Sequence, residues 1–312
     1  MKQIATIILM SLLALISCSA QEKVDVENQE NTNGPLFRIG VVTDVHHSAT
    51  KEATPERCYQ ASAGKLREAV KTFNDEKVNL VVSLGDLVDN EVDSYSVIDA
   101  ILDSLDMPVY KIAGNHDYMV PFVQSTQDRI MEMMGIEQPY FSIPVKDYRL
   151  IFLDTSEIST HANEKGTDNY IEANDLLQYL KEQEAPNAKK YNGAIGGRQM
   201  SWLKKELKTA DKNGEKIICL THMPLIPTNG KYSLWNAEDL ISILEKWTCV
   251  KAVFSGHDHR GGYATDKNIH FITFCGVVQG DTNSYAIADV YPDKIVIKGY
   301  GRETDRELEH LR

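Results

Sequence analysis

Short apolar runs alternate with segments of helical periodicity from Leu36 onward. Each run has the length of a β-strand and ends in polar residues. Because the runs are almost continuously apolar, we expect their strands to form a sheet whose faces are covered. The predicted strands are Leu36–Asp44, Val78–Asp86, Met107–Asp117, Tyr148–Thr155, Lys216–Pro224, Val250–His257 and Ile269–Gly276.

Helical spacing between these strands indicates an α/β fold. The predicted helices are Pro55–Glu76, Ser94–Leu105, Gly197–Ala210 and one that Asn236 would cap. This last helix is expected to bury three apolar side chains, Leu240, Leu244 and Trp247.

Two further regions break the alternation. Tyr285–Gly301 predicts a hairpin that turns at Pro292-Asp293, within a tail of strands that suggests a second sheet or antiparallel additions to the first. Ser156–Gly196 is long and polar, with one weak helix at Ile171–Lys181. Loops of that length inside a compact domain are usually functional.

Composition and charge narrow the class of partner. The 312 residues carry a formal net charge of -12, which argues against a nucleic-acid polymer because phosphate backbones require Lys/Arg stripes. A small anionic substrate remains compatible with this charge if bound cations supply positive charge locally.

The N-terminus predicts export and lipidation. Lys2 precedes the apolar stretch Ile4–Ile16, which is short for a membrane span. Leu15-Ile16-Ser17-Cys18 resembles a bacterial lipobox. We expect residues 1–17 to be a lipoprotein signal peptide, Cys18 to be lipidated, residues 18–35 to be a flexible tether, and residues 36–312 to be the functional domain. This predicts a membrane-anchored protein of the bacterial cell envelope, and an ordinary signal peptide is the alternative.

Four other cysteines occur without any C-x-x-C spacing: Cys58, Cys219, Cys249 and Cys275. Export permits disulfides, but three of these cysteines lie in or beside strand-like runs. We therefore expect buried free thiols.

Polar ligand-type residues follow one predicted strand after another. Because the carboxyl ends of strands gather along one edge of a sheet, these residues should converge in space. Each residue taken alone could be a cap, a turn residue or a surface histidine, but five such groups in succession argue against coincidence. The groups are Asp44 and His46; Asp86; Asn115, His116 and Asp117; His222; and His257 and His259.

This order of motifs resembles the calcineurin-like metallophosphoesterase superfamily, with D-x-H, G-D, G-N-H-D, H and G-H-x-H all present between Leu36 and Arg302. The resemblance implies a four-layer αββα sandwich of two mixed β-sheets flanked by helices. It also implies two divalent metal ions that share one carboxylate and activate a bridging water. The expected ligands are Asp44, His46, Asp86 and His259 for one ion and Asp86, Asn115, His222 and His257 for the other.

Oxygen and nitrogen ligands without cysteine suit manganese, with iron or zinc as alternatives. In the superfamily the residue matching His116 contacts the phosphoryl group and protonates the leaving oxygen, and we expect Asp117 to orient its ring and raise its pKa. His47 has no place in the pattern: it could lie behind the metal ligands or on the surface, and we expect it to be exposed. The remaining histidines are expected to be structural or on the surface: His161, His270 and His310.

A closer resemblance is to the manganese-dependent ADP-ribose/CDP-alcohol diphosphatases, through GDLVDN, PVYKIAGNHD, NGAIGGRQMSWLKKEL, THMPLIP and FSGHDHRGGY. Family members often have D-x-Q where this chain has Asp44-Val45-His46, which puts the metal preference in question. Purple acid phosphatases carry tyrosine where this chain has Asp89, which argues against that subfamily.

The closer resemblance implies cleavage of the diphosphate bridge in nucleoside diphosphate-linked alcohols or sugars. Tyr191, Asn192 and Gly193 would line the nucleoside side of the pocket, although a helix-entry turn explains them almost as well. Arg57 could contact the distal phosphate or lie on a solvated helix end.

Two alternative functions remain open at this point. The same metal centre could serve a broad phosphomonoesterase or a cyclic-nucleotide phosphodiesterase. A lipid-anchored phosphate-ligand binding protein that has lost catalysis is a non-enzyme alternative, which the complete set of ligands disfavours. Oligomeric state cannot be read from the sequence.

Overall fold

The computed structural model describes residues 34–89, 91–119, 127–227 and 230–310. The predicted signal peptide, Cys18 and nearly all of the predicted tether lie outside these residues. No helix within the described ranges is both long enough and apolar enough to cross a membrane.

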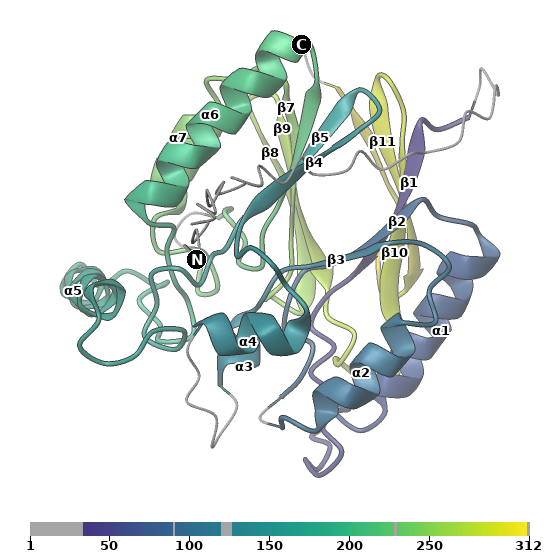
Figure 1. Cartoon of the computed structure of the whole chain (residues 1–312), viewed down its shortest axis with the longest axis horizontal. Coiled ribbons are helices and arrows are strands. Elements are labelled where there is room, and N and C mark those ends of the chain that lie inside the picture. The colour runs from purple at the N-terminus through teal and green to yellow at the C-terminus, as the bar shows by residue number, and fades with distance from the viewer. Residues whose placement is uncertain (1–33, 90, 120–126, 228–229, 311–312) are drawn as a thin grey trace, which may run out of the picture.

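Two six-stranded sheets form the centre of the molecule (Figure 1). The first sheet has the order β12-β11-β10-β1-β2-β3, and the second has the order β4-β5-β6-β7-β9-β8. In the first sheet, β1 (Phe37–Val42), β2 (Leu80–Ser83) and β3 (Val109–Lys111) run parallel. The antiparallel strands that complete it are β10 (Ser284–Val290), β11 (Lys294–Gly301) and β12 (Arg306–Glu309).

The second sheet has a parallel core of β5 (Tyr148–Phe152), β6 (Lys216–Leu220), β7 (Val250–Ser255) and β9 (Ile269–Cys275). Antiparallel edge strands flank it, β4 (Phe141–Val145) and β8 (Arg260–Asp266). Both sheets are therefore mixed, and the predicted hairpin at Pro292-Asp293 is confirmed as the β10–β11 connection.

Three hydrophobic layers hold these sheets and helices together. One layer lies between the sheets and includes Ile39, Phe254 and Ile272. Another joins the first sheet to α1 (Ser62–Asp75) and α2 (Ser94–Leu102), and a third joins the second sheet to α6 (Gly197–Asn213) and α7 (Ala237–Leu244). Figure 1 shows these helix pairs on opposite sides of the sheets, which confirms the predicted four-layer sandwich.

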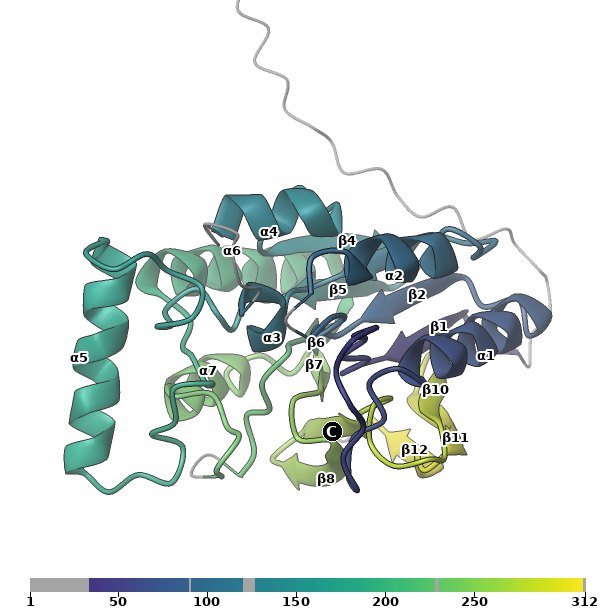
Figure 2. The same cartoon turned by 90° about the horizontal axis from the view of Figure 1, so that it is seen from below.

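Three short or peripheral helices complete the architecture. α3 (Asn115–Tyr118) and α4 (Gln127–Met134) follow β3, so the strand predicted to reach Asp117 ends early. α5 (Asp168–Glu182) confirms the weak helix of the long insertion and stands apart from the sheets (Figure 2).

Two predicted helix starts are corrected by tertiary contacts. The first helix begins at Ser62, because Arg57 forms a β-bridge with Gln279 and the Cys58 amide donates to the Val278 carbonyl. Asn236 precedes α7, but its side-chain amide exchanges hydrogen bonds with the Ile195 backbone instead of capping the helix.

Trp247 and two of the cysteines are less buried than expected. Trp247 lies beyond the last residue of α7 and is half-buried against the third layer. The four cysteines after Cys18 are all free thiols. Cys219 and Cys275 are buried, whereas Cys58 and Cys249 are partly exposed.

Candidate dinuclear metal centre

The polar residues predicted at the strand ends converge at one edge of the two sheets. Their backbone amides tie neighbouring loops together: Asp44 N donates to Gly85 O at 3.0 Å, and His46 N donates to Asp86 O at 2.8 Å. Four of these residues adopt left-handed backbone with φ of 45° to 68°: Asp44, His46, Asp86 and His257. Such conformations cost free energy outside glycine and cluster at functional sites.

Close packing at this edge requires glycine at two positions. A Cβ atom at Gly114 would lie 2.2 Å from Asp86 Oδ1, and one at Gly256 would lie 1.9 Å from Thr43 Oγ1. Both distances are far below van der Waals contact, so the G-N-H-D and G-H-x-H glycines let the β3 and β7 loops reach the carboxylates.

One donor set surrounds Asp44 Oδ1. This oxygen lies 3.2 Å from His259 Nε2 and 3.7 Å from His46 Nε2, and the two imidazole nitrogens are 3.1 Å apart. Asp86 Oδ2 approaches the same His46 nitrogen at 3.2 Å. The four groups predicted for one metal ion therefore converge.

A second donor set lies on the other side of Asp86. Its Oδ2 atom is 3.4 Å from His222 Nε2, which in turn lies 3.1 Å from His257 Nδ1 and 3.2 Å from Asn115 Oδ1. Asp86 Oδ2 thus belongs to both sets, as expected for a bridging carboxylate.

The pattern of unsatisfied atoms fits a pair of cations. Asp44 Oδ1 and Asp86 Oδ2 are buried and accept no hydrogen bond within the described part of the chain. Buried carboxylate oxygens without donors are costly unless a cation neutralises them. The oxygen and imidazole donors suit manganese, iron or zinc.

Neighbouring imidazoles control the charge of the two carboxylates. Burial opposes ionisation of Asp44, but His259 and His46 outweigh it and hold the pKa of Asp44 well below its ordinary value. Burial likewise opposes ionisation of Asp86, whereas His222 and His46 lower its pKa well below the usual range. Both carboxylates are therefore anionic and available as ligands.

Hydrogen bonds behind the imidazoles select which nitrogen faces the centre. His222 Nδ1 lies 2.7 Å from the Leu84 carbonyl oxygen and therefore carries the proton. Its Nε2 atom is left unprotonated and available as a metal ligand. His257 Nε2 lies 2.9 Å from Asn192 Oδ1. Because Asn192 Nδ2 donates to Asn187 O and Lys231 O, its oxygen is the atom that faces His257, which frees Nδ1.

His116 borders the first donor set. Its ring centroid is 4.4 Å from that of His46, and its side chain is 21% exposed, so a substrate could reach it. The carboxylate beside its Nδ1 belongs to Asp89, at 3.5 Å, and Asp89 also lies 3.5 Å from His46 Nδ1. Lys51 Nζ contacts Asp89 at 2.9 Å.

The expected contact between Asp117 and the His116 ring is corrected. Asp117 Oδ2 accepts the backbone amides of Asp86 and Gly114, both at 2.8 Å, and Oδ1 accepts the amide of Leu87 at 3.0 Å. The first turn of α3 directs this carboxylate toward the β2 loop, so Asp117 shapes the backbone around Asp86 and Asp89 takes the position beside His116.

The residues predicted to contact substrate separate into two groups. Asn192 is buried behind His257, and a Cβ atom at Gly193 would lie 2.5 Å from Thr155 O, so both serve local structure. Tyr191 borders the centre, with its ring 5.7 Å from the His257 ring. Arg57 is partly exposed. Burial lowers the pKa of His259, and the nearby positive charge of Arg57 lowers it further.

The expected exposure of His47 is wrong. Its side chain is only 5% exposed, and Nδ1 lies 3.3 Å from the Tyr59 carbonyl oxygen, which ties the β1 loop to the approach to α1. His270 contacts the Glu309 carbonyl and the Tyr263 hydroxyl and is structural, as expected.

Sequence reasoning missed the position of Asp89 beside His116, whereas His161 is structural, as expected. Asp89 lies in the GDLVD motif, three residues after the bridging Asp86. The sequence shows this spacing but not that Asp89 lies beside His116. His161 comes from the long insertion, where it spans Ser156 Oγ and Lys190 O. Burial lowers its pKa to about 4, so it braces the insertion as a neutral ring.

Comparison with known proteins agrees with this geometry. The profile of the calcineurin-like phosphoesterase family matches residues 37–261. The chain is 27% identical to the manganese-dependent ADP-ribose/CDP-alcohol diphosphatase of Homo sapiens, over 93% of this chain and 98% of the relative. The corresponding protein of Oryza sativa subsp. japonica is 26% identical, over 88% and 94%.

A solved structure resembles the whole described domain. The crystal structure of a dimetal phosphatase from Danio rerio has a TM-score of 0.80 and 26% identity, with coverage of 88% of this chain and 99% of that one. The fold and its paired donor sets define a metal-dependent phosphohydrolase. The chain belongs to the calcineurin-like phosphoesterase family.

Proposed function

We propose that the protein hydrolyses the diphosphate bridge of nucleoside diphosphate-linked alcohols or sugars, with two manganese ions as its cofactors. The observation that carries this proposal is the shared oxygen, Asp86 Oδ2, between two complete donor sets. The names of the human and rice relatives, manganese-dependent ADP-ribose/CDP-alcohol diphosphatase, support the choice of metal and substrate.

Two divalent cations bound in these sets would supply Lewis-acid stabilisation of phosphoryl oxygens and a water deprotonated near neutral pH as the nucleophile. His116 is placed to give a proton to the oxygen of the departing phosphate. Asp89 lies 3.5 Å from His116 Nδ1, where its negative charge would orient the ring and leave Nε2 for that proton transfer.

The substrate is tested by identifying products. Protein reconstituted with manganese is incubated in parallel with ADP-ribose, CDP-choline, bis-p-nitrophenyl phosphate and a phosphomonoester. We expect a nucleoside monophosphate from each of the first two, together with ribose 5-phosphate or phosphocholine. Turnover of the monoester or the phosphodiester without either diphosphate would refute the proposal in favour of the alternative phosphoesterase functions.

The metal centre is tested separately with Asp86→Asn. Removing the shared negative charge should leave fewer than two tightly bound manganese ions per chain, because both donor sets lose their common carboxylate. Calorimetric titration of the metal-free protein measures this number. Asp266→Asn, an exposed change at the end of β8, is the control and should retain two ions.

We propose further that lipid on Cys18 anchors the mature protein in the bacterial cell envelope. Lys2, the apolar stretch Ile4–Ile16 and the lipobox-like sequence before Cys18 support this location. Mass spectrometry of the mature N-terminus should find an acylated Cys18 as the first residue. An unmodified chain beginning elsewhere would contradict the anchor without affecting the hydrolase.

A further inference from the structure

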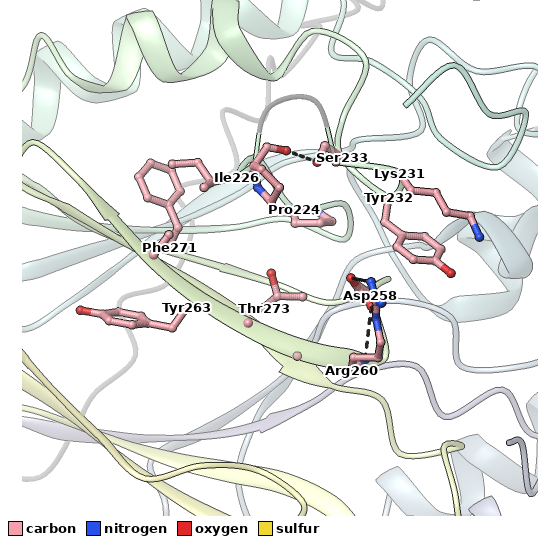
Figure 3. Close-up of a pocket in the computed structure, with 15 residues that line it drawn as sticks. Pro224, Ile226, Lys231, Tyr232, Ser233, Asp258, Arg260, Tyr263, Phe271 and Thr273 are labelled. Carbon is pink, nitrogen blue, oxygen red and sulfur yellow. Dashed lines mark hydrogen bonds and ion pairs between the residues drawn. The ribbon is translucent and has the colours of Figure 1, made fainter. Parts of the chain in front are cut away.

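A cavity of about 260 Å³ opens beside the metal centre, between the β6–α7 loop and the edge of the second sheet (Figure 3). Pro224 and Ile226 form one wall, and the opposite floor is the face of β8 and β9 that carries Gly262 and Thr273. Figure 3 shows Tyr232 at one end of the cavity, Phe271 at the other, and Thr273 between them.

Tyr232 lies between the cavity and the second donor set, since it lines the cavity and contacts His257. The Tyr232 ring centroid lies 5.6 Å from the His257 ring, at an interplanar angle of 88°. Asp258 and Arg260, which flank His259 in the sequence, also line the cavity. A substrate with its phosphates at the metal centre could therefore extend one end across Tyr232 into this space.

The shape of the cavity suits a planar group. Gly262 and Thr273 are directly paired across β8 and β9, so they share a face, and Gly262 leaves peptide backbone exposed there. A Cβ atom at Gly262 would meet only the Thr273 Cβ atom, at 3.9 Å. The floor is therefore flat and open, and the aromatic ring of Tyr232 closes one end.

The charges around Tyr232 disfavour a cationic ligand. Lys231 Nζ lies 5.1 Å and Arg260 Cζ 5.8 Å from the ring centroid. Asp258 pairs with Arg260 through contacts of 2.9 and 2.8 Å. The charged side chains that line the cavity are thus two cations and one carboxylate. The excess positive charge repels a quaternary ammonium, whereas it attracts an anionic phosphate and leaves a neutral base attached to that phosphate unopposed.

We propose that this cavity binds the nucleobase of the substrate, with Tyr232 as the stacking surface and Gly262 as the floor. Its volume is below the roughly 300–1,000 Å³ of sites that enclose a whole drug-sized ligand, so it accommodates one end of a substrate whose phosphates lie on the metals. The assignment rests on the proposed function for the diphosphate, but base recognition can be measured without turnover.

The experiment compares AMP with ribose 5-phosphate, which share sugar and phosphate and differ in the base. Calorimetry with manganese-loaded protein should show that AMP binds roughly 5- to 150-fold more tightly, as expected for one base stacked on an aromatic ring. Gly262→Val should remove this difference, because a β-branched side chain fits the strand and fills the space above the floor.

Three further variants control the measurement. Tyr232→Ala should also bring AMP to the affinity of ribose 5-phosphate, whereas Tyr232→Phe should retain the preference because it keeps the ring. Thr265→Val, on the same strand but exposed, should behave as the wild type. Thermal unfolding of each variant verifies that the fold is intact.

Equal affinity of the wild type for AMP and ribose 5-phosphate, including no binding of either, would overturn the proposal. An AMP preference that survives both Gly262→Val and Tyr232→Ala would overturn it as well. Failure of the proposed function is distinguishable, because it appears as absent diphosphate hydrolysis while AMP binding is measured at equilibrium.

Discussion

Asp86 determines the chemistry of this site through a single oxygen. Its Oδ1 atom accepts the His116 amide at 2.7 Å, while Oδ2 lies between His46 and His222. The carboxylate is thereby fixed in rotation, and the atom left without a hydrogen bond points between the two donor sets. Positioning of this kind is what allows a site to hold two cations close together without rearrangement.

His116 and Asp89 should act together on the leaving group. His116→Ala should lower kcat for substrates with poor leaving groups by ~10²–10⁴-fold, the contribution of a general acid, and Asp89→Asn should lower it less. Both effects should shrink with bis-p-nitrophenyl phosphate, whose leaving group needs little protonation. Steady-state kinetics on both substrates tests this, with Asp103→Asn at the exposed end of α2 as the control.

Equal losses on the two substrates in His116→Ala would show that the residue acts on metal binding or folding. Metal titration of that variant should still find two manganese ions. A loss of one ion would remove His116 from the role of proton donor.

Asn192 should support the second metal site through His257. Asn192→Ala removes the acceptor that selects the His257 tautomer, and we expect the second manganese ion to bind about 10–100-fold more weakly. The first ion should be unaffected, because its donor set does not include His257. Calorimetry resolves the two sites, and Asn213→Ala on the exposed end of α6 is the matched control. Uniform weakening at both sites would indicate a general loss of structure.

At the scale of elements, strand ends supply the ligands and helices supply stability. β1, β2, β6 and β7 each lead into a ligand loop, and the parallel pairs β1–β2 and β6–β7 bring those loops to one edge. α6 lies outside the second sheet, with Leu203 and Leu207 fully buried in the layer that it forms with β5 and β6. This division separates stability from chemistry.

Leu207→Ala should destabilise the fold without changing the metal centre. Removing a fully buried leucine side chain costs about 2–5 kcal/mol, depending on how far the cavity collapses. Urea unfolding measures this loss, with Lys208→Ala on the exposed face of the same helix as the control. Manganese stoichiometry should stay at two per chain. A concurrent loss of metal would show that α6 also positions the ligand loops.

At the scale of the whole molecule, the last described residues close the interface between the sheets. Tyr148 of β5 donates its hydroxyl to the Tyr291 carbonyl at 2.9 Å, and His310 Nε2 lies 3.1 Å from the same hydroxyl. Burial, with Lys251 and Lys216 nearby, lowers the pKa of His310 to about 4. His310 is thus tied to the second sheet as a neutral imidazole.

Stability should decrease as the pH falls from about 6.5 to about 4 in part through His310. The unfolded chain protonates this histidine near pH 6.5, whereas the folded chain does so near 4, so the unfolded state binds more protons in this window. Above pH 6.5 the histidine is neutral in both states, and this loss of stability is absent. Urea unfolding of metal-free protein should show a shallower dependence on pH in His310→Phe than in the wild type. Identical slopes would contradict the assignment.

The amino-acid sequence alone predicted most of the strands and helices and the metal ligands. The alternation of apolar runs and helical spacing predicted strands in a sheet covered on its faces, since burial of strands and amphipathic helices is local and periodic. The two-sheet sandwich was implied only by the resemblance to the family. The ligand residues were predictable because each follows a strand, and strand ends of a parallel sheet share one edge. β8 escaped prediction, because its glycine-rich sequence RGGYATD lacks an apolar pattern.

Only the tertiary structure decided which groups brace the ligands and where a substrate could extend. Asp89 contacts His116, and both Asn192 and Tyr232 contact His257, in each case between loops that are distant in sequence. Such contacts depend on side-chain directions and on the packing of one sheet against the other, which no local pattern records. Asp117 illustrates the difference: its neighbour in sequence is His116, but its helical turn aims the carboxylate at the backbone of the β2 loop.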